Sequence, residues 1–223
     1  MASIPRELTI RRRFASFAVV VILLSKFVPA QADHHHTSTE TLGSVTFTTS
    51  CSSKVQPQFN RAVALMHSFQ FADAIQGFNA ILAVEPSCSM AYWGIALNNW
   101  GNPFAPGLKA PGQIERGVKA IRLARAIAPR TERERDYLHA VAYLFDDAAS
   151  TDQRSRVLAY EQAMATLSAA YPQDTEATIF YALALAAAAD PSDKTYARQL
   201  KAGAILEGVI VDSRNTVRDA HAS

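Results

Sequence analysis

Three prolines that each follow an apolar helical stretch recur at a constant interval along the chain. Pro86, Pro129 and Pro172 stand 43 residues apart, and a new helical pattern begins within a few residues of each one. A single pair of helices of this size cannot bury its apolar face alone, so successive pairs have to stack on one another. The repeat therefore predicts an all-α protein, built as a right-handed solenoid of about four antiparallel helix pairs.

Apolar residues fall at helical spacing through most of the chain beyond residue 54. Only nine glycines and ten prolines occur among 223 residues, which favours helices over a turn-rich β-sandwich. We expect a helical repeat domain over 54–212, a loop at 101–112 and a disordered tail over 213–223. The first predicted helix begins with the apolar residues of 59–66, and the further helices cover about 71–84, 90–100, 113–128, 132–146, 153–170, 174–189 and 193–211.

The first 32 residues have the layout of an export signal. A basic stretch at 11–13 precedes a mostly apolar run over 14–24, and Ala30-Gln31-Ala32 has the small-x-small pattern of a cleavage site. A helix made of that apolar run spans roughly 16 Å, short of the ~30 Å hydrocarbon core of a bilayer. We therefore expect a cleaved signal and no stable membrane span, with an uncleaved anchor as the alternative. The mature protein should be periplasmic or secreted, by the Sec or the twin-arginine route.

The positive charge of the chain is concentrated in this signal. Residues 1–32 carry a net charge of +4, which leaves −2 for the rest of a chain whose formal charge is +2. A mildly acidic body has no basic field that would attract phosphates. The charge distribution therefore speaks against a nucleic-acid partner.

Residues 33–53 are polar and rich in Thr and Ser, which predicts a flexible leader with a short extended piece at 45–48. If the signal is cut after Ala32, the new N-terminus reads Asp33-His34-His35. Its amine, two amide nitrogens and an imidazole form a square-planar set that suits Cu(II) or Ni(II). We expect His34 and His35 to hold a metal ion only after that cleavage. Loose binding without a role is the alternative, and no other cofactor is predicted.

Cys51 and Cys88 are the two cysteines of the chain. In an oxidising compartment a disulfide is the leading interpretation, and two free buried thiols are the alternative. Cys51 precedes the first predicted helix, and Cys88 lies in the turn between the second and third. An antiparallel hairpin brings the start of its first helix and the end of its second to the same side, within bridging distance.

The second helix of each pair carries a recognisable spacing. Ala74, Phe78 and Pro86 match the A-x-x-x-F-x-x-x-x-x-x-x-P pattern of the tetratricopeptide repeat, although Ile81 stands where the repeat has a small residue. Similar spacing recurs at Gly117, Ile121, Ala124 and Pro129, and more loosely at Tyr160, Met164, Leu167 and Pro172. The chain thus resembles tetratricopeptide-repeat proteins. The usual period is about 34 residues, so the resemblance implies inserted loops, and it implies a concave groove lined by the first helix of each pair.

A second resemblance covers residues 42–207. The segments LGSVTFTTSC, AYWGIALNNWGNPF, YPQDTEATIFYALAL and DPSDKTYARQLKAGAILE are similar to the opening half of a family of exported bacterial tetratricopeptide-repeat proteins. Those relatives are longer and continue into repeats with His-containing motifs, whereas this chain leaves the pattern after Glu207. The resemblance implies a truncated family member. It also raises an alternative function, a metal-handling or enzymatic protein whose site needs the missing repeats.

The sequence contains no motif that predicts catalysis. A phosphate loop, a G-x-S-x-G elbow and an H-E-x-x-H pair are all absent. His67 and His139 are interpreted as packed or rim histidines, the TERERD stretch at 131–136 as an exposed helix start, and Asp146-Asp147 as a solvated helix end. We therefore expect a protein without enzymatic activity.

The predicted groove is the remaining candidate site. Aromatic residues and methionine on the first helices would serve there as anchors for a bound protein or peptide, unless they fill the packing between pairs instead. The function predicted from the sequence is an exported scaffold that binds an unknown protein or peptide. The candidate groove residues are Phe59, Val63, Met66, Trp93, Leu97, Trp100 and Tyr143.

Overall fold

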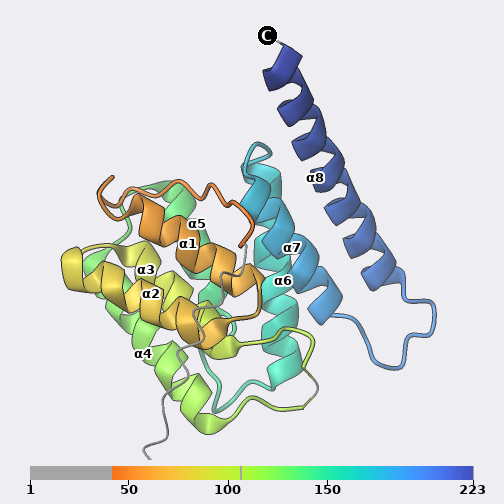
Figure 1. The fold of residues 1–223 in the computed structure, drawn as a ribbon. Coiled ribbons are helices and arrows are strands. Elements are labelled where there is room, and N and C mark those ends of the chain that lie inside the picture. The colour runs from red at the N-terminus through yellow and green to blue at the C-terminus, as the bar shows by residue number, and fades with distance from the viewer. Residues whose placement is uncertain (1–41, 106, 223) are drawn as a thin grey trace, which may run out of the picture. The chain divides into compact units, whose positions relative to one another are not determined.

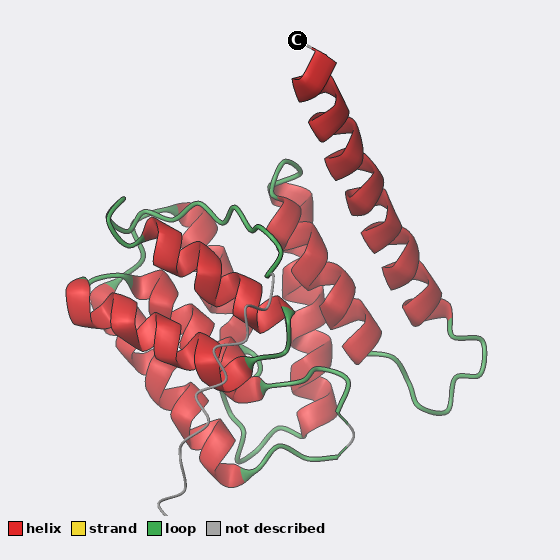
Figure 2. Cartoon of the chain, viewed as in Figure 1, coloured by secondary structure: helices red, strands yellow, loops and turns green. Residues whose placement is uncertain are grey.

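The computed structural model describes residues 42–105 and 107–222 (Figure 1). Within these residues it contains eight helices and no strand (Figure 2), so the all-α prediction is confirmed. Each helix packs against the next one in sequence, and α3 also contacts α1 and α5. The helices are α1 (Gln56–His67), α2 (Phe71–Val84), α3 (Ser89–Trp100), α4 (Pro111–Ile127), α5 (Glu132–Ala142), α6 (Gln153–Ala170), α7 (Thr175–Ala187) and α8 (Ala197–Ala222).

The starts of three helices follow directly from capping residues. The side chains of Thr131, Asp152 and Asp174 accept hydrogen bonds from backbone N–H groups in the first turns of α5, α6 and α7. Pro111 opens α4 at the position where a missing N–H costs nothing. These local signals explain why the predicted bounds of most helices lie within a few residues of the observed ones.

The C-terminal end differs from its prediction. Asp190 and Asp193 accept hydrogen bonds from the backbone N–H groups of Ser192 and Thr195, and these local turns delay the start of α8 to Ala197. The helix then continues to Ala222, where a disordered tail over 213–223 was expected. No Gly or Pro lies between residues 209 and 222, so nothing in the sequence interrupts the helix.

The leader also differs from its prediction over residues 42–53, whereas residues 33–41 lie outside the described part. The Phe47 side chain is fully buried. Its backbone N–H donates to Asn60, and its carbonyl accepts from the Gln56 side chain. This segment is therefore packed rather than flexible, because one aromatic ring and its main chain find partners on α1.

A disulfide joins Cys51 and Cys88, as the helix-hairpin geometry predicts. Their Cα atoms are 5.2 Å apart. Cys51 lies shortly before α1, and Cys88 is the residue at the N-cap of α3. The bond thus holds the segment that precedes α1 against the turn between α2 and α3.

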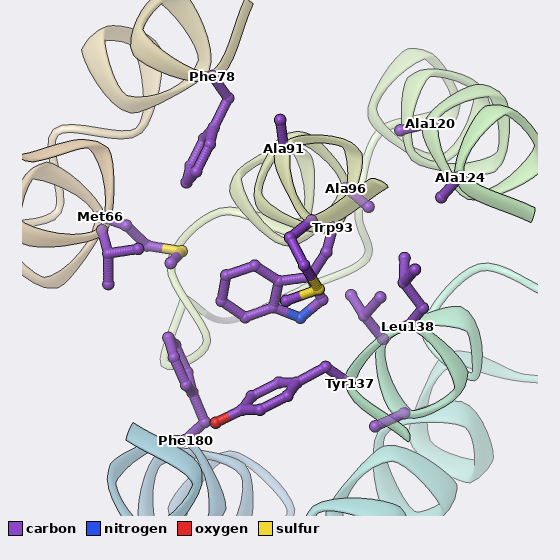
Figure 3. Packing of buried hydrophobic residues seen from close by; sticks show 14 of the residues in the cluster. Met66, Phe78, Ala91, Trp93, Ala96, Ala120, Ala124, Tyr137, Leu138 and Phe180 are labelled. Carbon is purple, nitrogen blue, oxygen red and sulfur yellow. The ribbon is translucent and has the colours of Figure 1, made fainter. Parts of the chain in front are cut away.

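The centre of the core is the indole of Trp93 on α3. Figure 3 shows it among Met66, Tyr137 and Phe180, which come from α1, α5 and α7. The rings of Tyr137 and Phe180 meet it edge to face, with centroids 5.5 and 5.3 Å away. One side chain therefore connects helices that lie far apart in the sequence.

Candidate functional site

The end of α1 and the start of α7 meet through a side-chain pair. His67 Nε2 lies 2.7 Å from Glu176 Oε2, and the His67 ring stacks on Phe180 with centroids 5.2 Å apart. His67 is partly exposed whereas Glu176 is buried. The pair links the first described helix to the seventh, and the His67 side chain lines a pocket.

This pocket, called the apolar pocket below, has a volume of about 230 Å³. Polar groups on its lining side chains are confined to His67, Trp100 and Tyr160, and burial raises the pKa of Tyr160 above its ordinary value. The lining residues are Met66, His67, Phe69, Phe71, Leu97, Trp100, Gly101, Pro103, Leu144, Val157, Tyr160, Ile179, Phe180, Leu183, Ala184, Ala187 and Leu206.

The size of the pocket limits what it can hold. A dry cavity of about 150 Å³ accepts benzene, whereas pockets for drug-sized ligands measure about 300–1,000 Å³. A volume between these values suits one bulky aromatic or branched apolar group. Such a group can be the side chain of a bound peptide.

Phe69 is an unusual member of the lining. Half of its side chain is exposed, and its backbone has a positive φ of 61°, a conformation that bulky residues rarely adopt. The short turn between α1 and α2 therefore holds an aromatic ring at the pocket where solvent can still reach it. Exposed aromatic rings beside a pocket are typical of binding sites.

The predicted groove residues divide into three groups. Met66, Leu97 and Trp100 line the apolar pocket. Phe59, Val63 and Trp93 are at most 2% exposed, and the ring of Phe47 lies against Phe59 and Trp93, so these side chains are not free as anchors while Phe47 is in place. Tyr143 lies apart from the pocket, against the ring of His139 at 5.0 Å between centroids.

The prediction missed the contributions of α7 and α8 to the pocket. Phe180 and Leu183 stand in the apolar run IFYALAL, which marks a buried helix but not the helix that it faces. Leu206 comes from α8. Side-chain contacts of α7 with His67 on α1 and Trp93 on α3 bring Phe180 to this part of the fold.

A second polar cluster lies where the leader crosses the first turn of α5. Glu134 is 1% exposed and accepts hydrogen bonds of 2.6 Å from both the N–H and the Oγ of Ser50. Arg133 Nε lies 2.6 Å from Asp174, and Arg133 also donates to the carbonyl of Thr48. Within the TERERD stretch, residues 48–50 therefore cover Arg133 and Glu134, whereas Thr131, Glu132, Arg135 and Asp136 are exposed as predicted.

Tyr137 belongs to the same cluster. Its hydroxyl donates to Asp174 at 2.9 Å, and the Arg133 guanidinium lies over its ring. Burial, followed by the charge of Asp174, raises the pKa of Tyr137 far above its ordinary value. The cluster joins α5 to the N-terminus of α7, and its groups are engaged with one another.

The predicted metal site and export signal cannot be placed, since His34, His35 and residues 1–32 lie outside the described part. Among the residues that are described, no group of three His, Cys, Asp or Glu side chains is arranged to hold a metal ion. None of the helices within 42–105 and 107–222 combines the length and apolar content that a membrane span requires.

Compared with known proteins, the chain matches no family model, no curated protein and no solved structure. The resemblance to tetratricopeptide-repeat proteins therefore stays a prediction from the sequence motifs. A functional conclusion has to come from the geometry of the apolar pocket and its surroundings.

Proposed function

We propose that this protein is an exported helical-repeat scaffold, without catalytic activity, that binds a partner protein through one bulky apolar side chain. The observation that carries the proposal is the apolar pocket of about 230 Å³, with Phe69 half-exposed beside it. An aromatic or aliphatic side chain buried there would contribute about 1.5–3 kcal/mol. That is the scale of a hot-spot residue in a protein interface.

The architecture that we propose for the scaffold is a solenoid of tetratricopeptide-like helix pairs. Helices pack in sequence order, and α3 also contacts both α1 and α5, as stacked pairs would require. Small residues stand where helices approach closely. Gly94 lies against the ring of Phe78, and Gly117 lies against the ring of Phe145.

Export is supported by the layout of residues 1–32 and by the disulfide between Cys51 and Cys88, since disulfides persist in oxidising compartments. N-terminal sequencing of the protein recovered from a bacterial periplasm tests this part. A mature chain that begins at Asp33 is expected, and it would also create the Cu(II) or Ni(II) site at His34 and His35. Recovery of uncleaved chain in the cytoplasm would contradict export.

The binding proposal is tested by selecting peptides from a displayed library on the oxidised protein. Selected peptides should share a Phe, Trp, Leu or Met. Their affinity should fall at least about tenfold, which is about 1.4 kcal/mol, when Ala187→Trp places a large ring in the pocket. A Trp on the exposed side of α2, in Ala80→Trp, is the control and should leave the affinity unchanged.

A second pair of variants separates the pocket from general surface apolarity. Phe69 and Phe104 are each 50% exposed, but only Phe69 lines the pocket. Phe69→Ala should weaken the selected peptides, whereas Phe104→Ala should not. Peptides that lack a bulky apolar residue, or that bind all four variants equally, would refute the proposed site.

A further inference from the structure

Residues 45–50, called the strap below, lie across α1, α3 and α5 and form no helix or strand of their own. The ring of Phe47 is the anchor of the strap. It contacts Phe59 of α1, Trp93 of α3 and Tyr137 of α5 at centroid distances of 5.4, 5.2 and 5.1 Å. The Arg133 guanidinium lies 4.8 Å from the ring centroid. One aromatic side chain thus fills a slot made by three helices.

The main chain of the strap is bound almost entirely by side chains of the helices. On the α1 side, Gln56 donates to the carbonyl of Phe47 at 2.7 Å and accepts from the Thr49 N–H at 3.2 Å, and Asn60 accepts from the Phe47 N–H at 3.2 Å. These three hydrogen bonds involve only the backbone of the strap, as in other cases of extended-peptide recognition, and the Thr49 hydroxyl adds a fourth to Gln56 at 3.1 Å.

The opposite side of the strap is held from α5 and the residues that precede it. Arg133 donates to the carbonyl of Thr48 at 2.8 Å, and Arg130 donates to the carbonyl of Ser50 at 2.7 Å. Glu134 accepts from both the N–H and the hydroxyl of Ser50. The hydroxyl contact favours a short hydroxylated residue three positions after the aromatic ring.

We propose that this face of α1, α3 and α5 is a peptide-binding site that the strap occupies in cis. Its occupant in trans would be an extended protein segment with an aromatic residue at the position of Phe47 and short hydroxylated residues after it. The site is separate from the apolar pocket, and the inference does not rest on the proposed function of that pocket. In the resting protein the strap would block the site against weak competitors.

Competition between the strap and an added peptide determines the affinity that a titration measures. A tethered segment acts at an effective concentration on the order of millimolar, so a peptide of the same sequence binds poorly while the strap is seated. A variant whose strap cannot fill the slot should accept the peptide directly. Changes confined to the strap leave every side chain of the binding face intact.

The test uses a labelled synthetic peptide of residues 42–53 carrying Cys51→Ser, titrated against the full, oxidised chain. Phe47→Ala should bind this peptide at least about tenfold more tightly than the unchanged protein, and a peptide with Phe47→Ala should not bind. Thr49→Pro, which removes the N–H and the hydroxyl that donate to Gln56 but keeps the Phe47 ring, should give a smaller gain. Thr48→Ala is the control, because the Thr48 side chain is exposed.

Circular dichroism shows which variants are folded. If Phe47→Ala does not fold, the peptide titration is done with Thr49→Pro. Equal affinity of the folded variants and the unchanged protein would overturn the inference. So would equal binding of the peptides with and without the aromatic ring.

Hydrogen exchange of the unchanged protein gives an independent result. The amides of Phe47, Thr49 and Ser50 should exchange faster than those of α3, and exchange only by global unfolding would also overturn the inference.

Discussion

The ring of Phe78 on α2 lies against the backbone of Gly94 on α3, so closely that a Cβ atom at residue 94 would overlap the ring. Both helices are buried along this contact, and Phe78 is fully buried. The absence of a side chain at residue 94 therefore determines how closely α2 and α3 approach each other.

Replacing this glycine is expected to destabilise the protein despite the better helix propensity of alanine. Gly94→Ala should lower the free energy of unfolding by about 1–3 kcal/mol, the usual effect of overpacking. Gly203 on α8 is the matched control, because a Cβ there meets nothing within 4 Å. Gly203→Ala should raise stability by up to about 1 kcal/mol. Urea unfolding measures both, and a stabilising Gly94→Ala would contradict the contact.

The pair formed by His67 and Glu176 should couple α1 to α7 energetically. Their side chains are 2.7 Å apart, and Glu176 is buried, so removing one partner leaves the other without its contact. A double-mutant cycle with His67→Ala and Glu176→Ala is expected to give a coupling of about 0.5–3 kcal/mol. Pairing His67→Ala with Glu207→Ala, an exposed residue of α8, should give none. Additive effects in the first cycle would show that the contact does not hold the helices together.

Stability should fall at alkaline pH because of Tyr137. Burial and the carboxylate of Asp174 raise the pKa of its phenol in the folded protein, whereas the unfolded chain ionises near pH 10. The neutral phenol stabilises the fold fully below that pH. Above it, the contribution declines by about 1.4 kcal/mol per pH unit.

Comparison with Tyr137→Phe isolates this effect from the other titrating groups. The variant loses the hydrogen bond to Asp174 and should be less stable than the unchanged protein at neutral pH. Its stability should decline less steeply between about pH 10 and 11. Parallel curves for the two proteins, obtained by urea unfolding, would mean that Tyr137 ionises in the folded state as readily as in the unfolded chain.

Local signals were enough to predict the helices and the disulfide. The helical period, the prolines and caps such as Thr131 and Asp152 act within a few residues, so they can be recognised without knowing the fold. The bridge between Cys51 and Cys88 could also be predicted, because it depends on the geometry of one helix hairpin alone.

Burial of the leader could not be predicted, because the free energy gained by burying Phe47 depends on residues far away in the sequence. Phe47 is one aromatic ring in a polar stretch, and the slot that it fills exists only when Phe59, Trp93 and Tyr137 converge. The same limit applies to the apolar pocket. Met66 lies on the predicted face, whereas Phe180 joins it through the contact between α1 and α7.

Reduction of the disulfide should loosen the strap before the rest of the fold. The bond between Cys51 and Cys88 spans 37 positions, for which the chain-entropy model gives about 4 kcal/mol. We expect a smaller loss, because two further contacts hold the same ends together. Arg130 donates to both Ser50 and Ser87, and the Ser52 N–H donates to Glu85.

The measurement is hydrogen exchange of the protein with and without a reductant, with the Cys51→Ser/Cys88→Ser double variant as a reagent-free comparison. Protection of the Phe47, Thr49 and Ser50 amides should fall first, since Cys51 is the residue next to the strap. Protection in α6 and α7 should change little, because these helices pack on each other and carry no part of the bridge. A uniform loss of protection in all helices would show that the disulfide stabilises the whole fold and not the strap.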